Sequence, residues 1–183
     1  MAEIPEVPSR RNHLNEQTRL AADKAGLPTV VSEKGRVFAA QPAAVFVFIF
    51  RDDEKVLVLR QPGASAWRSV GGAVEAGETL LEAALRETAE EVGAGVRARP
   101  LGVAHAWTFR YDDRVRQMID VAWVMAYDGG DVVPGDDMVG SDWRWCATAE
   151  ISELQIDVPE GTGWLLQRAL DVFRTYRNGR LNP

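Results

Sequence analysis

Hydrophobic and polar positions along the chain follow two periods, which predict strands interleaved with helices. The unbroken apolar run Ala43–Phe50 predicts a buried strand, and Lys55–Arg60, after a polar turn, predicts the second strand of a hairpin. Further strands are predicted near residues 96–104, 105–111, 117–127 and 143–147. Apolar residues at helical spacing predict helices at residues 12–25, 79–92, 149–155 and 161–178. This mixture indicates an α/β or α+β sandwich.

The N-terminal segment differs from the rest of the chain. Residues 1–11 contain several Pro and Arg residues and are expected to form a loose arm, followed by the helix at 12–25. Residues 29–38 are expected to form a short hairpin. We therefore expect an N-terminal arm with a helix and a hairpin over residues 1–41, and a main domain over residues 42–183.

Composition and charge narrow the class of protein. The 183 residues are 46% hydrophobic, enough for a core, and 21 Lys and Arg against 27 Asp and Glu give a net charge of −6. Because nucleic-acid-coating proteins need a basic face, no nucleic-acid partner is expected. A single cysteine, Cys146, excludes an internal disulfide and a multi-cysteine zinc site. The apolar runs are too short to span a bilayer, and no secretory signal is visible, so we expect a cytoplasmic protein without a membrane partner.

Negative charge is concentrated between residues 71 and 94, where six glutamates accompany a single arginine, Arg86. Glu87, Glu90 and Glu91 lie at i, i+3 and i+4 and therefore share one face of the predicted helix. Their repulsion costs about 0.2–0.5 kcal/mol per pair. A divalent cation would convert this repulsion into attraction, and hard oxygen ligands suit Mg²⁺ or Mn²⁺ better than Zn²⁺.

Local signals define the ends of this helix and the loop before it. Thr79 and Glu82 predict a capping box, and Gly93 predicts a left-handed C-terminal stop. A double glycine ending at Gly72, in a loop predicted over residues 61–78, lets a backbone carbonyl approach an ion. For the helix alone, a solvated acidic face partly neutralised by Arg86 is the alternative interpretation.

Together, the loop and the helix resemble the Nudix box, Gly-x5-Glu-x7-Arg-Glu-U-x-Glu-Glu-x-Gly-U, in which U is a bulky aliphatic residue. The fixed positions are all matched, by Gly72, Glu78, Arg86, Glu87, Glu90, Glu91 and Gly93. Thr88 and Ala94 depart from the pattern at U, and Trp67-Arg68-Ser69-Val70 stands where the family often has Trp-x-Leu-Pro. The wider resemblance covers residues 42–178 and implies the Nudix α/β/α sandwich with a mixed sheet.

The resemblance implies an enzyme that hydrolyses a phosphoanhydride bond in a nucleoside diphosphate linked to another group, with Mg²⁺ or Mn²⁺ as cofactor. The implied metal ligands are the Gly72 carbonyl, Glu87, Glu90 and Glu91. Glu87 acting as a general base is left open. Arg86 is expected to orient the carboxylates through ion pairs, Glu78 among them. Arg86 and the three glutamates are thus the expected catalytic residues.

Four residues are candidates for substrate contacts. Trp107 and Tyr111 fall on one face of a predicted strand, where they either stack on a nucleobase or pack half-buried in the sheet. Arg60, or Arg110 as the alternative, is a candidate for a phosphate contact. Asp120 interrupts an apolar strand, and a buried carboxylate needs a partner or a proton. We expect a substrate contact or base at Asp120, or alternatively a bond to a backbone amide.

An additional acidic ligand and the oligomeric state are less clearly indicated by the residues. Asp136 and Asp137, before the strand at 143–147, could supply an additional acid, although an ordinary turn is the favoured interpretation. The expected partner is a small-molecule diphosphate substrate, and a homodimer that uses the N-terminal hairpin is an alternative to a monomer.

The main alternative is a Nudix-fold protein that binds a ligand or regulates without hydrolysis, but such proteins often lose the box glutamates that this chain keeps. Isopentenyl diphosphate isomerase shares the fold but needs a cysteine upstream of the box. Here Cys146 lies downstream, which argues against the isomerase.

Overall fold

We describe the protein from a computed structural model, which places residues 10–153 and 162–178. The chain divides into two compact units. Unit 1 comprises Met1–Pro42 and Thr108–Ile119, and unit 2 comprises Ala43–Trp107 and Asp120–Pro183. The N-terminal segment is therefore grouped with residues 108–119, which the sequence pattern assigned to the main domain.

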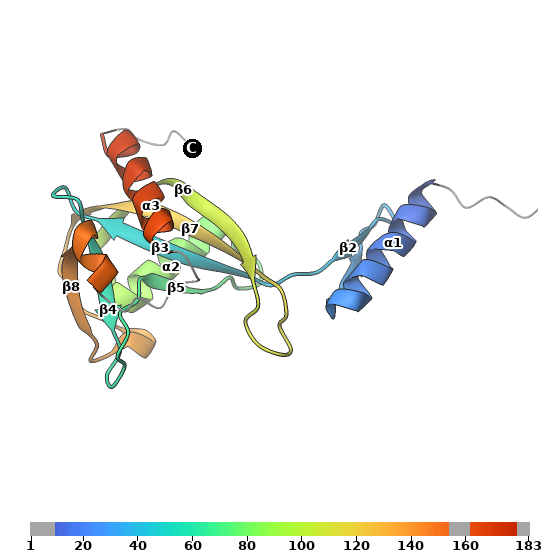
Figure 1. Cartoon of the computed structure of the whole chain (residues 1–183), viewed down its shortest axis with the longest axis horizontal. Coiled ribbons are helices and arrows are strands. Elements are labelled where there is room, and N and C mark those ends of the chain that lie inside the picture. The colour runs from blue at the N-terminus through green and yellow to red at the C-terminus, as the bar shows by residue number, and fades with distance from the viewer. Residues whose placement is uncertain (1–9, 154–161, 179–183) are drawn as a thin grey trace, which may run out of the picture. The chain divides into compact units, whose positions relative to one another are not determined.

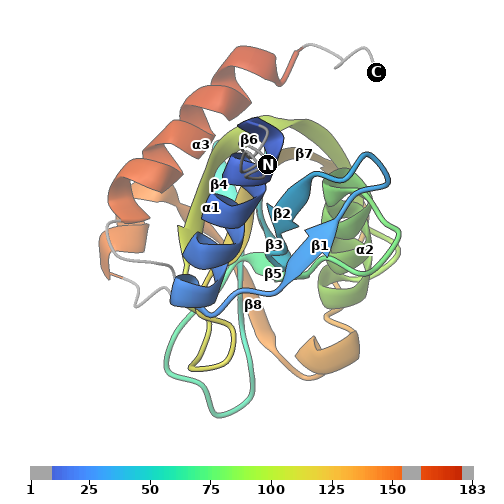
Figure 2. The same cartoon turned by 90° about the vertical axis from the view of Figure 1, so that its right-hand side faces the viewer.

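Unit 1 combines one helix with a two-stranded sheet. Helix α1 spans Arg10–Ala25, and strands β1, Thr29–Val31, and β2, Val37–Ala39, pair antiparallel as the predicted hairpin. Figure 2 shows α1 alongside this hairpin. The buried Asn15 side chain links them, since its amide donates to the Gly35 carbonyl at 2.7 Å and its carbonyl accepts from the Val37 N–H at 3.0 Å.

Unit 2 is built on a six-stranded sheet, seen in Figure 1. Its strands are β3, Ala43–Phe50; β4, Lys55–Arg60; β5, Val70–Ala73; β6, Arg97–Phe109; β7, Met118–Gly129; and β8, Asp142–Ala147. The order is β6-β7-β3-β4-β8, and β5 pairs antiparallel with β3. The helical segments are α2, Leu80–Val92; the 3-10 turns η1, Asp136–Met138, and η2, Thr148–Glu153; and α3, Thr162–Tyr176.

The sheet is buried on both faces because β3 is apolar at nearly every position. Phe48 and Phe50 join a core cluster with residues of α3, whereas Val47 and Ile49 join a second cluster with residues of α2. Helices therefore cover opposite faces of the sheet, as Figure 1 shows. This layering confirms the predicted α/β/α sandwich.

Some predicted elements differ from those observed. The loop expected over residues 61–78 contains β5, and the two strands expected at 96–104 and 105–111 are a single strand, β6. The helix expected at 149–155 is the 3-10 segment η2, with its last two expected residues outside the described part of the chain. Among the described helices, none is long and apolar enough to cross a membrane.

Candidate active site

The site is built where β5 meets α2 on one face of the sheet. Strand β5 places Gly72 opposite Val45 and Gly71 opposite Phe46 of β3. Helix α2 begins at the predicted capping box, since the Thr79 side chain accepts from the Glu82 N–H and the Glu82 carboxylate accepts from the Thr79 N–H. The helix start is thus fixed by local bonds, and the pairing of β5 with β3 brings the double glycine beside α2.

Gly72 and Glu87 are in close contact. A Cβ atom built on Gly72 would overlap the Glu87 carboxylate, so only glycine lets this carboxylate lie against the β5 backbone. The Glu87 side chain is largely buried, and burial raises its pKa above the usual value although Arg86 opposes the shift. The predicted metal ligands Gly72 and Glu87 are therefore brought together.

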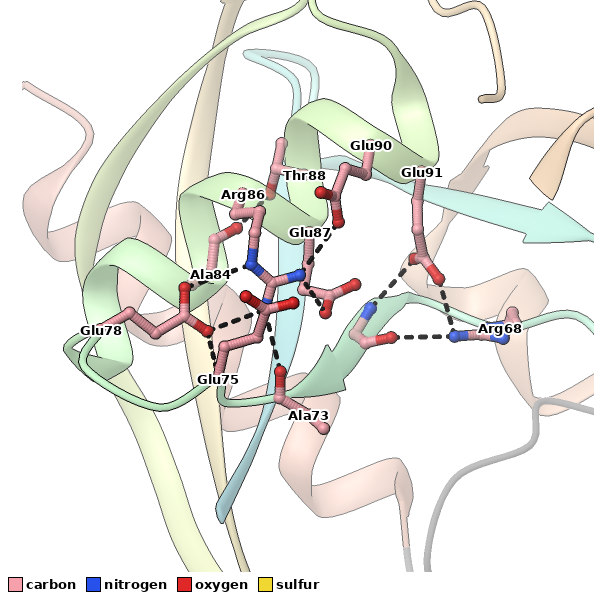
Figure 3. A network of polar contacts seen from close by, with 11 residues as sticks. Arg68, Ala73, Glu75, Glu78, Ala84, Arg86, Glu87, Thr88, Glu90 and Glu91 are labelled. Carbon is pink, nitrogen blue, oxygen red and sulfur yellow. Dashed lines mark hydrogen bonds and ion pairs between the residues drawn. The ribbon is translucent and has the colours of Figure 1, made fainter. Parts of the chain in front are cut away.

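Arg86 is the centre of the polar network in Figure 3. Its guanidinium bonds the carboxylates of Glu78 at 2.8 Å, Glu87 at 2.8 Å and Glu90 at 2.9 Å, and it donates to the Ala73 carbonyl at 2.9 Å. These bonds raise the pKa of Arg86 further above its already high value. Arg86 therefore pairs with Glu78, Glu87 and Glu90, whereas its expected role in orienting the carboxylates for catalysis stays a prediction.

Glu91 has a different environment from the other two glutamates. Its side chain is only 3% exposed, and its carboxylate accepts from Arg68 Nη2 at 2.8 Å and from the Gly71 N–H at 3.0 Å. Arg68 also donates to the Gly71 carbonyl at 3.0 Å. Burial raises the pKa of Glu91 to about 7, although Arg68 and the Gly71 amide favour the charged form.

The three carboxylates are thus graded in burial rather than aligned on one solvated face. Glu90 is 41% exposed in its side chain, whereas Glu87 and Glu91 are largely buried. Helical spacing explains the difference, because Glu91 follows the buried Ala84 and Thr88 by seven and three residues and so continues the packed stripe of α2.

Two residues near these carboxylates were not placed at the site by the sequence. In the sequence, Arg68 is notable only because it departs from the Trp-x-Leu-Pro pattern. In the structure, its side chain bonds the Glu91 carboxylate. Asp137, in η1, lies near enough that its negative charge contributes to the raised pKa of both Glu87 and Glu91. Its position before a predicted strand was the only signal for it, and a turn was the favoured interpretation.

The donor atoms suit a hard divalent cation, although they are paired with arginines in this arrangement. In residues 10–153 and 162–178, no group of three or more His, Cys, Asp or Glu side chains forms a ready metal cluster. Glu87 and Glu90 share Arg86, and Glu91 is bound to Arg68. All of the predicted metal-ligand atoms are oxygens, which Mg²⁺ and Mn²⁺ prefer. The Glu87 carboxylate also lies directly against the Gly72 backbone.

Arg60 and Trp107 lie within unit 2 in separate contacts. Arg60 ends β4, pairs with Asp142 at 2.5 Å and stacks over the ring of Trp67 at 4.7 Å. Trp107 packs against the core cluster on the α3 side of the sheet, with Phe46 at 6.5 Å between ring centroids. Its buried Nε1 has no hydrogen-bond partner among the described residues.

Asp120 and Tyr111 are the other two candidates for substrate contacts. Asp120 is only 7% exposed, and its Oδ1 has no hydrogen-bond partner in the described chain. Burial raises the pKa of Asp120 to about 6, although the Val121 N–H bonds the carboxylate. Tyr111 belongs to unit 1 and is exposed. For Arg60, Trp107, Tyr111 and Asp120, a role in substrate binding stays a prediction.

Comparison with known proteins identifies the family. Residues 40–166 match the NUDIX domain family, and the chain belongs to that family. It is 30% identical over 102 residues to the NAD-capped RNA hydrolase NudC of Chromobacterium violaceum, covering 55% of this chain and 36% of that protein. It is 44% identical over 64 residues to the RNA pyrophosphohydrolase of Halorhodospira halophila, covering 34% of this chain and 35% of that protein. The chain thus spans little more than a third of the length of these relatives.

Solved structures agree on the fold. A UDP-X diphosphatase superposes with a TM-score of 0.60 at 19% identity, over 78% of this chain and 67% of that chain. A NUDIX hydrolase from Nitrosomonas europaea superposes with a TM-score of 0.57 at 17% identity, over 74% of this chain and 90% of that chain. At these identities the likeness concerns the fold alone.

Proposed function

We propose that this protein is a divalent-metal-dependent pyrophosphohydrolase that cleaves a phosphoanhydride bond in a nucleoside diphosphate linked to another group. The observation that carries the proposal is the closely packed group of Gly72, Glu87 and Glu91, whose carboxylates are buried beside a glycine backbone. Buried carboxylates are costly unless cations or hydrogen bonds compensate them. Arg86, Arg68 and the Gly71 N–H compensate them here, but replacing such buried ion pairs by apolar side chains is often neutral or stabilising, so stability alone does not explain them.

The residues that would hold the cation are Glu87, Glu90, Glu91 and the Gly72 carbonyl. A divalent ion bound to them would screen the substrate phosphates from the acidic helix and lower the pKa of an attacking water. Arg86 holds Glu87 and Glu90 at fixed positions, and the Gly71 N–H and Arg68 hold Glu91. These bonds preorganise the carboxylates, which lowers the cost of assembling the site.

The substrate panel follows from the chemistry and from the relatives. It should contain nucleoside triphosphates, diadenosine polyphosphates, ADP-ribose, NADH and nucleotide sugars. Relatives named as NAD-capped RNA hydrolase, RNA pyrophosphohydrolase and dihydroneopterin triphosphate diphosphatase add NAD-capped RNA, an RNA that carries a pyrophosphate bond, and dihydroneopterin triphosphate. Each should be tested with Mg²⁺ and with Mn²⁺, by phosphate or nucleotide release.

Removing a single carboxylate tests the assignment. We expect Glu91→Gln and Glu87→Gln to lower metal-dependent turnover by about 100-fold or more, the scale typical of a lost group that stabilises transition-state charge. Glu75→Gln, an exposed glutamate in the same segment, is the matched control and should keep turnover within about twofold. Full turnover by Glu91→Gln would refute the ligand assignment. Metal binding without turnover on the whole panel would favour the non-hydrolytic alternative.

A further inference from the structure

The two units carry net charges of opposite sign. Over Met1–Pro42 and Thr108–Ile119, unit 1 has nine Lys and Arg against seven Asp and Glu, a net charge of +2. The remaining residues have twelve against twenty, a net charge of −8. The acidic total of −6, which predicted no nucleic-acid partner, therefore averages over two units of opposite sign.

A pocket in unit 1 gathers part of this positive charge. It has a volume of about 450 Å³, is open to solvent, and is lined by residues of α1, β6 and the turn that follows β6. Lys24, Arg110 and Arg116 supply three cations to its wall, and Thr108 and Gln117 supply a hydroxyl and an amide. The lining contains no Asp or Glu. Such a wall suits an oxyanion with several hydrogen-bond acceptors.

Acidic residues close in sequence neutralise only one of the three cations of the pocket. The Asp112 carboxylate accepts from the N–H groups of Arg114 at 2.7 Å and Val115 at 2.6 Å, and Asp113 pairs with Arg110. Within the described chain, Lys24 and Arg116 have no carboxylate within ion-pair distance. The Arg116 side chain lies against Gly26, just beyond α1, and its Nε donates to the Asp113 carbonyl at 3.3 Å. Two full positive charges are therefore left at the pocket.

Aromatic residues adjoin these cations. Phe109 lines the pocket, and its ring meets the exposed Tyr111 ring edge-on at 6.5 Å between centroids. Elsewhere on unit 1, Arg36 stacks over the exposed Phe38 ring at 5.9 Å. Cations that track phosphates, combined with exposed rings on which bases stack, are the common means of binding single-stranded nucleic acid.

We propose that unit 1 binds single-stranded nucleic acid, with the pocket of Lys24, Arg110 and Arg116 holding a backbone phosphate. A polynucleotide fits better than a mononucleotide because unit 1 places six further cations outside the pocket, more than one phosphate group needs. This binding does not depend on the proposed hydrolysis.

The test is a binding measurement on the full chain in EDTA. The probe is a fluorescein-labelled single-stranded RNA of about 12 nucleotides with a 5′-hydroxyl end, which offers no phosphoanhydride bond and is long enough for one typical site. Fluorescence anisotropy follows binding from about 50 to 200 mM KCl. The pocket variant is Lys24→Gln/Arg116→Gln. The control is Arg51→Gln/Arg174→Gln, which makes the same charge change on unit 2.

We expect the pocket variant to bind at least about tenfold more weakly at the lowest salt, with the salt slope reduced by about 0.7, the value for the single phosphate contact that the pocket makes. The control should stay within about twofold of the parent. Equal losses in both variants, or no loss in the pocket variant, would overturn the proposal. Adenosine monophosphate that competes with the same affinity as the RNA would also overturn it, because the pocket would then hold a free nucleotide. Since EDTA removes the metal, failure here leaves the hydrolase proposal untouched.

Discussion

Asp120 is a buried carboxylate that has no cationic partner among the residues that the structure describes. Its neighbours on β7 are apolar, and within the described ranges the Val121 N–H is the one group that bonds the carboxylate. Desolvation is therefore the largest influence on the pKa of Asp120 and raises it to about 6. A folded-state pKa above the ordinary value of 3.8 means that the native state holds this proton more tightly than the unfolded chain does.

The pH dependence of stability tests this assignment. Asp120 costs no stability below about pH 4 and its full destabilising effect develops above about pH 6. We expect Asp120→Asn to gain about 1–3 kcal/mol in unfolding free energy relative to the parent between about pH 4.5 and pH 8, from a shift of about two pKa units. Urea unfolding at each pH measures this difference. Asp52→Asn, on an exposed turn, is the control. A difference between variant and parent that stays constant with pH would contradict the assignment.

Glu91 shows what can and cannot be read from residue spacing. The spacing of the box predicted that these residues lie close together, and in the structure Gly72 lies against Glu87 and Arg86 bonds Glu78. It did not distinguish a buried glutamate from an exposed one. That distinction depends on which stripe of α2 faces the sheet, which is a property of tertiary packing.

Helix α2 combines packing on one side with chemistry on another. Ala83, Ala84 and Val92 are fully buried in the core cluster, whereas Arg86 holds three carboxylates on the other side. The Arg86 side chain is 24% exposed, so its ion pairs are partly shielded from water. Such pairs are worth more than surface pairs, and removing their shared cation leaves the carboxylates without compensation.

Substitution of Arg86 therefore has a metal-dependent effect on stability. We expect Arg86→Gln to lower the unfolding free energy in EDTA by about 1–3 kcal/mol, below the full value for buried pairs because the site is partly exposed. Millimolar Mg²⁺ should reduce the loss, since a bound cation compensates the same carboxylates. Arg174→Gln, which breaks a surface pair with Glu54, should cost less than about 1 kcal/mol in either condition. An Arg86→Gln loss that is equal with and without Mg²⁺ would contradict this explanation.

Elements were predictable where local signals are strong. The capping box fixed the start of α2, and the apolar runs fixed β3 and β4. The C-terminal stop was predicted only in part, because Gly93 has a positive φ of 103° with ψ of 137°, outside the left-handed helical region. Strand β5 was missed because its double glycine has low strand propensity, and its pairing with β3 depends on residues distant in sequence.

At the scale of the whole molecule, the two units differ in how they are stabilised. Both core clusters draw only on residues of unit 2. Among the described residues of unit 1, the buried hydrophobic side chains are Ala22, Val37 and Met118. Complete burial of a larger side chain, such as that of Val37 or Met118, contributes up to about 1.5–3 kcal/mol to the free energy of unfolding. The stability of the sheet and its helices therefore should not depend on the N-terminal segment.

A chain that begins at Pro42 tests this independence. The six tryptophans all lie in unit 2, so their fluorescence reports the unfolding of that unit alone. We expect the truncated chain to keep its cooperative tryptophan transition, with a change in unfolding free energy of less than about 1–2 kcal/mol, the scale of an ordinary single substitution. It should also keep Mn²⁺ binding, because the predicted ligands and both arginines that position them belong to unit 2. Loss of the cooperative transition would show that residues 1–41 are part of the folding unit, and the division at Pro42 would then be wrong.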